Sequence, residues 1–212
     1  MAGFFVTVEG IDGSGKSTQA RLLAERLRQE GETVIEVRDP GTTALGERVR
    51  GVLLDRSPDQ APSAFAEVAL FLAARVQLLQ EVIEPALEQA EVVVCDRYLD
   101  STLAYQGYGR GLDPDRLLEL HRLAGADRMP DLTLVFDLEV EAARRRGSPE
   151  LPLDRMESEP TTYHERVRQG YRALALRFPE RVVVLSAKPA PDEVAAACWR
   201  VVSDRVTARR NA

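Results

Sequence analysis

The segment VEGIDGSGKST, residues 8–18, decides the fold. Gly10, Gly15, Lys16 and Ser17 match the pattern G-x-x-x-x-G-K-[ST] of a phosphate-binding loop. The apolar run FFVTV precedes the segment and an amphipathic stripe follows it, which is the strand-to-helix setting that such a loop requires. Backbone N–H groups and the positive end of the helix would hold a phosphate there. A glycine-rich turn without a ligand is the alternative, and the setting favours nucleotide binding.

Five short apolar runs rich in β-branched residues alternate with helical patterns. The runs cover residues 4–8, 33–37, 92–95, 132–136 and 181–185. Helical stripes cover residues 16–31, 63–88, 114–124, 161–177 and 192–206, the second as one long helix or two joined ones. This alternation predicts the α/β P-loop NTPase fold, a five-stranded parallel sheet with helices on both faces. We expect a single P-loop domain over residues 1–212.

The composition excludes several classes of protein. The 212 residues carry a formal charge of -6, which argues against a general binder of nucleic acid or of membrane surfaces. We see no signal peptide and no apolar run of membrane-spanning length, and we therefore expect a cytoplasmic protein. Cys95 and Cys198 are expected to be buried free thiols. His121 and His164 have no partner that the sequence identifies, and we expect both on the surface.

The loop and the third strand together predict a magnesium site. Lys16 would reach the β- and γ-phosphates of a nucleotide, while the hydroxyl of Ser17 would bind Mg²⁺. The third apolar run ends in VVVCDRY, so Asp96 stands where a Walker-B carboxylate would hold the metal. A buried Asp–Arg pair that merely closes the strand is the alternative for Asp96 and Arg97.

Charged residues from several strand ends predict a second anionic ligand. The second apolar run ends in VRDPG, which brings Arg38 and Asp39 to the sheet edge that already carries Lys16, Asp96 and Arg97. This is more charge than one triphosphate needs. We infer that a second ligand with a phosphate group binds beside the first.

The residues resemble the thymidylate kinase family over nearly the whole chain. EGIDGSGKSTQ resembles its phosphate loop, RDPGTTALGERVR its R-E-P-G-G-T-x-L-G-E-x-[IV]-R segment, and ALFLAARVQL its acceptor-binding helix. DRYLDSTLAYQGYGRGL is the most specific match, because D-R-Y-x-x-S-x-x-A-Y-Q-G is close to a family signature. PDLTLVFDL and DRME resemble the fourth strand and the far end of the lid. The resemblance implies phosphorylation of dTMP by ATP with Mg²⁺, and a homodimer.

The resemblance also implies where the acceptor nucleoside binds. Phe71 would stack on the thymine ring, and Arg75 would hydrogen-bond the base. Thr102 and Gln106 would lie near the base, and Tyr105 would lie against the deoxyribose, leaving little room for a 2′-hydroxyl.

Phosphate-binding residues are implied in the same way. Arg38 and Arg97 would hold the monophosphate of the acceptor, with Asp39 near the reacting phosphates. The implied ATP-binding residues are Gly10, Asp12, Gly13, Ser14, Gly15, Lys16, Ser17 and Thr18, and the implied magnesium ligands are Ser17 and Asp96. Because the second pKa of the acceptor phosphate is about 6, no general base is needed, and catalysis must come from positioning and charge neutralisation.

A lid segment, residues 141–157, is expected to supply a further arginine. No basic residue lies between Gly10 and Gly15, and the family places the extra arginine either there or in the lid. The candidates are Arg144, Arg145 and Arg146, with Arg155 at the far end. We predict Arg146, although each of the three could instead form a solvated helix face. GSPELPL, residues 147–153, is predicted to be a flexible loop.

The chain departs from the family pattern at three places. Asp39 replaces a glutamate, and Thr42 replaces a glycine and should tolerate a positive φ poorly. The lid sequence RRRGSPELPLDRME replaces a more compact basic one. Other functions remain open. One is a nucleoside or deoxynucleoside kinase, whose hydroxyl acceptor would need a carboxylate base, and another is a different nucleoside monophosphate kinase. A P-loop switch, or an inactive relative that only binds nucleotides, is the third.

Overall fold

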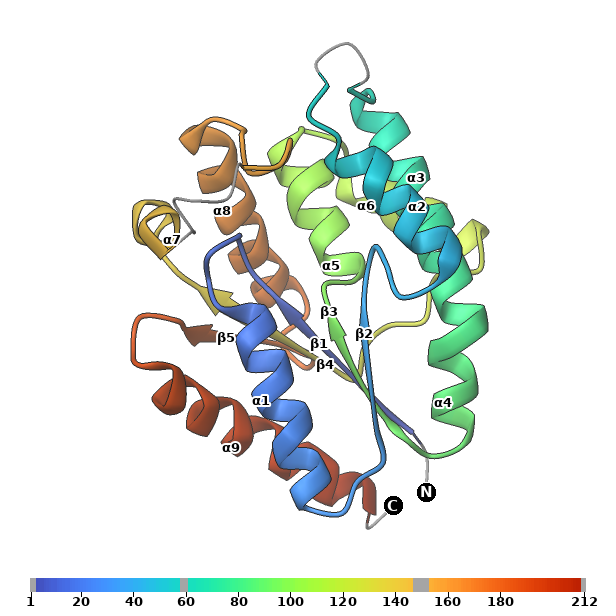
Figure 1. The fold of residues 1–212 in the computed structure, drawn as a ribbon, viewed down its shortest axis with the longest axis vertical. Coiled ribbons are helices and arrows are strands. Elements are labelled where there is room, and N and C mark those ends of the chain that lie inside the picture. The colour runs from blue at the N-terminus through green and yellow to red at the C-terminus, as the bar shows by residue number, and fades with distance from the viewer. Residues whose placement is uncertain (1–2, 58–60, 147–152, 211–212) are drawn as a thin grey trace.

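A computed structural model describes residues 3–57, 61–146 and 153–210. Five parallel strands form one sheet in the order β2-β3-β1-β4-β5 (Figure 1). The strands are β1 (Phe4–Glu9), β2 (Val34–Arg38), β3 (Val92–Asp96), β4 (Leu132–Asp137) and β5 (Val182–Ser186). All five predicted strands are therefore confirmed, and each observed strand ends one residue later than predicted.

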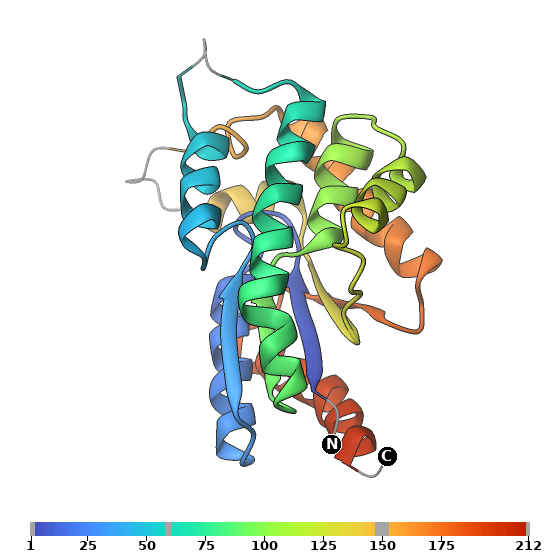
Figure 2. The ribbon, with the colours of Figure 1, turned by 90° about the vertical axis from the view of Figure 1, so that its right-hand side faces the viewer.

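Helices cover both faces of the sheet (Figure 1). They are α1 (Lys16–Gln29), α2 (Ala44–Leu54), α3 (Ala64–Leu78), η2 (Leu79–Ile83), α4 (Glu84–Glu88), α5 (Leu99–Thr102), η3 (Leu103–Gly109), α6 (Pro114–Leu123), α7 (Val140–Arg146), α8 (Thr161–Arg177) and α9 (Pro191–Arg210). The two η segments are π-helical, and η2 joins α3 to α4 in one continuous helical rod, as the stripe predicted (Figure 2). The predicted P-loop NTPase architecture is confirmed.

Three helical stretches escaped the sequence analysis. Helix α2 contains Gly46 and Gly51, which weaken a helical pattern, and it begins where the Thr43 hydroxyl accepts a hydrogen bond from Gly46 N at 2.9 Å. Helix α7 has only seven residues. The stretch α5–η3 contains two glycines, and its π-helical part does not follow the 3.6-residue period on which the prediction depended.

The register of the sheet brings the predicted site residues together. β1 is buried at every position, because strands flank it on both sides and helices cover both faces. Asp96 pairs with Val8 of β1 on one side and with Arg38 of β2 on the other. Arg97 N then donates to Val8 O at 3.0 Å, so the first residue after β3 is tied to the start of the phosphate loop.

Other expectations have mixed outcomes. Cys95 and Cys198 are buried free thiols, as predicted. The expectation of surface histidines is wrong, because His121 is fully buried and His164 is 6% exposed. The predicted loop at 147–153 lies outside the described residues apart from Leu153. Within the described ranges, no helix is both long enough and apolar enough to cross a membrane.

Candidate active site

The phosphate loop depends on glycines in the left-handed region. Gly13 has φ +77°, and a Cβ atom there would lie 2.2 Å from the carbonyl oxygen of Ala143 in α7. Gly15 has φ +90° and stands directly before α1. Only glycine meets both demands at low cost, so the loop can turn its backbone toward the start of the helix.

Lys16 is held at this turn by oxygen atoms. Its Nζ donates to Ile11 O at 3.2 Å and to Asp12 Oδ1 at 3.1 Å. Burial and the nearby charge of Arg97 lower the pKa of Lys16, and the charges of Asp12 and Asp96 partly offset this shift. Burial alone would raise the pKa of Asp12, but the charges of Arg97 and Lys16 lower it. Asp12 is thus an ion-pair partner of both cations.

A cavity of about 620 Å³ opens over the loop. Its lining includes all predicted ATP-binding residues except Gly10, together with Arg146 of α7. The guanidinium group of Arg146 donates to Ala187 O at 2.8 Å and to Lys188 O at 3.3 Å. Glycine N–H groups, a helix start and a lysine are the groups that bind polyphosphate.

Ser17 and Asp96 fit the needs of a hard cation. The Ser17 hydroxyl lies 2.5 Å from Asp96 Oδ2, while Asp96 Oδ1 is buried and has no hydrogen-bond partner in the described structure. Mg²⁺ prefers such oxygens and fills its remaining positions with water and phosphate oxygens. Among the described residues, no group of three or more His, Cys, Asp or Glu side chains is placed to hold a metal ion.

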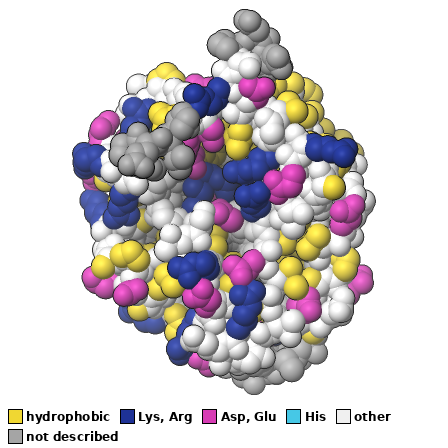
Figure 3. Space-filling model, viewed as in Figure 1, with side chains coloured by type: hydrophobic (Ala, Val, Ile, Leu, Met, Phe, Trp, Pro, Cys, Tyr) yellow, Lys and Arg dark blue, Asp and Glu magenta, His cyan; other side chains and the backbone are white. Residues whose placement is uncertain are grey.

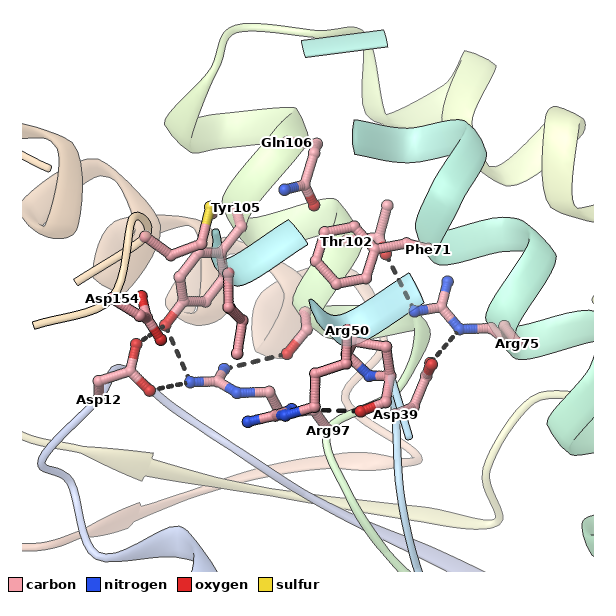
Figure 4. A pocket seen from close by; sticks show the side chains of 14 residues that line it. Asp12, Asp39, Arg50, Phe71, Arg75, Arg97, Thr102, Tyr105, Gln106 and Asp154 are labelled. Atoms are coloured by element: carbon pink, nitrogen blue, oxygen red, sulfur yellow. Dashed lines mark hydrogen bonds and ion pairs between the residues drawn. The ribbon is translucent and has the colours of Figure 1, made fainter. Parts of the chain in front are cut away.

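A second cavity, drawn in Figure 4, shares Asp12 with the first. Its lining residues are Asp12, Asp39, Pro40, Arg50, Leu54, Phe71, Arg75, Arg97, Ser101, Thr102, Tyr105, Gln106, Asp154 and Met156. Every residue predicted to bind the acceptor lies here except Arg38. The predicted phosphate-loop site and the predicted acceptor site are therefore neighbours, and Figure 3 shows basic side chains gathered around a hollow on this side.

Arg97 lines the acceptor cavity and pairs with Asp12, the residue that both cavities share. Its φ of +69° is unusual for a residue other than glycine and points to a functional constraint. The side chain forms an ion pair with Asp12 and donates to Gly10 O at 3.1 Å. Its guanidinium carbon lies 5.0 Å from the centre of the Tyr105 ring, and the Tyr105 hydroxyl contacts Asp12 at 3.2 Å.

Arg75 is fixed from four directions. Nε donates to Asp39 Oδ2 at 2.6 Å, and Nη2 donates to Tyr98 O at 3.1 Å and Thr102 Oγ1 at 3.0 Å. Nη1 lies 2.6 Å from His121 Nε2, a partner that the sequence did not reveal. Burial raises the pKa of Asp39, although the charge of Arg75 counteracts this. Asp39 thus pairs with the predicted base-binding arginine at one edge of the acceptor cavity.

Arg50 of α2 lines the acceptor cavity together with Arg97. Burial and the charges of Arg38 and Arg97 lower the pKa of Arg50. Arg38 itself is exposed and pairs with Glu47 at 2.8 Å. Sequence analysis did not single out Arg50, because α2 was not predicted. Its place at the end of RDPGTTALGERVR was the available signal.

The other lid arginines take separate positions. Arg144 donates to Glu159 O at 2.9 Å, and Arg145 is exposed. Arg155 pairs with the buried Glu67 of α3 at 2.6 Å and donates to Leu53 O at 3.0 Å. Of the four candidates, Arg146 is the one that lines the cavity over the phosphate loop.

Comparison with known proteins places this geometry in one family. The model of the thymidylate kinase family matches residues 8–198. A thymidylate kinase of Synechococcus sp. (strain JA-2-3B'a(2-13)) is 48% identical, over 95% of each chain. One from Deinococcus radiodurans is 45% identical, over 96% of this chain and 98% of that one. The crystal structure of thymidylate kinase from Ehrlichia chaffeensis matches with a TM-score of 0.77 and 33% identity, over 96% of this chain and 99% of that one.

This chain belongs to the thymidylate kinase family. The thymidylate kinase pattern has a glycine where this chain has Thr42, and Thr42 nevertheless adopts φ +67°. Two hydrogen bonds stabilise it there: Arg38 N donates to Thr42 Oγ1 at 2.9 Å, and Thr42 N donates to Glu47 Oε1 at 2.8 Å. The Thr42 side chain makes the positive φ costly, and its hydroxyl group also stabilises the loop in that conformation.

Proposed function

We propose that this chain transfers the γ-phosphate of MgATP to the phosphate of dTMP. The supporting observation is that Arg50 and Arg97 line a cavity that shares Asp12 with the phosphate loop, while the charge of Arg38 also acts on Arg50. Such a cluster is stabilised by a bound dianion. A monophosphate held there would face the phosphate loop that holds the donor.

In this proposal each group of residues has one task. Gly10, the loop residues 12–15 and Thr18 surround the phosphates of ATP, and Lys16 neutralises them. Arg97 and Arg50, with Arg38 beside them, hold the acceptor phosphate. The base and sugar of dTMP lie among Phe71, Arg75, Thr102, Tyr105 and Gln106, which line the second cavity.

Catalysis depends on charge and position. The acceptor phosphate is largely dianionic near pH 7, so it attacks without a base. Arg97 pairs with Asp12, which lines both cavities, and would stabilise the charge that spreads over the transferred group. Ser17 and Asp96 would hold Mg²⁺, which supplies further charge neutralisation when bound. Arg146 would turn its guanidinium group from the Ala187 and Lys188 carbonyls to the transferred phosphate.

Two further features belong to the proposal. Phe65 of α3 and Leu123 of α6 are 62% and 70% exposed, although both are large and apolar. A face of this kind supports a homodimer through α3 and α6, which sedimentation velocity would test. We place the protein in the cytoplasm, with no nucleic-acid or membrane partner.

The test is ADP release by purified protein with MgATP. It is measured without an acceptor and then with dTMP, dUMP, UMP, CMP, AMP, GMP or thymidine. Strong stimulation by dTMP and weak stimulation by UMP is the expected result. Preference for thymidine would identify a nucleoside kinase instead, and equal slow release with every addition would identify a switch or a binding protein.

A further inference from the structure

Glu67 is a buried carboxylate behind the acceptor cavity. It lies on α3 one turn before Phe71, and its side chain is 1% exposed. Two arginines donate to Oε1 of Glu67: Arg155 through Nη1 at 2.6 Å, and Arg110 through Nη2 at 3.0 Å. Gln106 Nε2 donates to its Oε2 at 3.1 Å. Glu67 thus forms ion pairs with two guanidinium groups.

This contact fixes which end of the Gln106 amide faces the cavity. An ionised carboxylate has no proton to donate, so only the NH₂ end of the amide can bind it. In Figure 4 the carbonyl oxygen of Gln106 is directed toward Thr102 and Phe71, whereas the amide nitrogen is directed away from them. Among the described residues, none donates a hydrogen bond to this oxygen. Gln106 therefore presents a hydrogen-bond acceptor to the ligand.

Arg75 presents the opposite polarity. A guanidinium group has five N–H donors, and four of those of Arg75 are taken by Asp39, His121, Tyr98 O and Thr102. One N–H of Nη1 remains. Because Arg75 lines the cavity, this N–H can serve as a donor beside the acceptor of Gln106.

This pair matches one kind of pyrimidine edge. A 4-keto pyrimidine carries an acceptor at O4 and a donor at N3, whereas a 4-amino pyrimidine carries a donor at position 4 and an acceptor at N3. We propose that Glu67 is a specificity-determining positioning residue that locks the Gln106 amide and so excludes 4-amino pyrimidines. The inference rests on the proposed function, because it concerns the base of the same acceptor.

The experiment compares kcat and KM for dTMP, dUMP and dCMP in wild type, Glu67→Gln and Arg110→Met. Glutamine has nearly the same shape but can accept or donate, so it frees the amide of Gln106 to turn. Arg110→Met removes an ion-pair partner of Glu67 but leaves the carboxylate in place. dUMP has the same keto edge as dTMP and controls for general loosening of the cavity.

Wild type should prefer dTMP over dCMP by about 10³-fold or more in kcat/KM. Glu67→Gln should reduce this preference by about tenfold, mainly through KM, because the contact is made in ground state and transition state alike. The ratio of dTMP to dUMP should change by less than about twofold. Arg110→Met should lower the melting temperature and leave the preference for dTMP over dCMP intact.

The outcomes separate the two proposals. Wild type that fails to phosphorylate dTMP would refute the proposed function. If wild type is active but Glu67→Gln keeps the wild-type preference for dTMP over dCMP, the role of Glu67 is refuted and the proposed function stands. The same holds if Arg110→Met changes this preference as much as Glu67→Gln does. If Glu67→Gln does not fold, NMR of the Gln106 side-chain NH₂ in wild type decides. Protection of that group from exchange both with and without dTMP supports the lock, and loss of protection on dTMP binding contradicts it.

Discussion

His121 accepts a hydrogen bond from Arg75, with 2.6 Å between Nε2 and Nη1. Its Nδ1 lies 2.7 Å from Leu117 O, which can only accept, so Nδ1 carries the proton and the lone pair of Nε2 faces Arg75. Burial and the charge of Arg75 lower the pKa of His121 to about 4. A neutral imidazole is thus built into the support of the predicted base-binding arginine.

This neutral histidine should make stability depend on pH. The unfolded chain binds a proton at His121 below pH 6.5, whereas the folded chain binds it only near pH 4. The stability contributed by His121 is therefore full above pH 6.5 and is lost as the pH falls toward 4, with a slope of at most about 1.4 kcal/mol per pH unit. His121→Gln keeps an acceptor for Arg75 but cannot titrate. The free energy of unfolding of both proteins is measured in urea from pH 4 to 7.5. The difference between wild type and variant should follow this slope, and a difference that does not change with pH would contradict the prediction.

Glu9 should give a slope of the opposite sign. Burial and the charge of Asp100 raise the pKa of Glu9 from 4.5 to about 7, although the charge of Arg97 and the hydrogen bonds of Ser101 and Tyr171 lower it. The folded chain thus binds this proton more tightly, and the stability linked to it is lost as the pH rises from 4.5 to 7. In Glu9→Gln the free energy of unfolding should fall less over that range than in wild type. The same urea series measures it, and parallel curves for the two proteins would show that Glu9 titrates normally.

The main architecture was readable from the sequence because it depends on local patterns. β-branched runs separated by amphipathic stripes predicted all five strands, and the first helical stripe ends at Gly31, where the backbone has φ +88°. The phosphate loop was predictable because its glycines and Lys16 lie within a few residues of one another. The acceptor cavity was predictable by resemblance, since no single residue in it carries a local signal.

Residues that act through distant partners could not be predicted. Glu67 receives Gln106, Arg110 and Arg155 from positions 39 to 88 residues away. His121 was expected on the surface because a histidine at a polar helix end carries no mark of its contact with Arg75, 46 residues away. Such contacts arise from the packing of α3 against η3 and α6, and no periodicity encodes them.

Arg50 is predicted to be essential for acceptor binding. Arg50→Met should lower kcat/KM for dTMP by about 10- to 100-fold, mainly through KM, because one charge-assisted contact to the acceptor phosphate is lost. KM for ATP should change little. Steady-state kinetics with each substrate varied in turn provides the measurement.

The matched control for Arg50 is Arg48→Met. Arg48 lies on the same helix but is exposed and does not line the acceptor cavity. Arg48→Met removes the same charge from α2 as Arg50→Met does, so any effect of net charge alone would appear equally in both variants. Equal kinetics of the two variants would refute the assignment of Arg50.

Gly13 is predicted to set the distance between the phosphate loop and α7. In Gly13→Ala the new methyl group would meet the Ala143 carbonyl at 2.2 Å, and the backbone would keep a φ of +77°. Gly31→Ala is the control, because Gly31 has φ +88° and open space around its Cβ position. Both variants should lose about 1–2 kcal/mol of stability from the left-handed backbone. Only Gly13→Ala should also weaken ATP binding, by about tenfold or more, since α7 or the loop must move to relieve the clash. Calorimetric titration with ATP separates the two effects, and unchanged ATP affinity in Gly13→Ala would mean that the loop does not need this close contact.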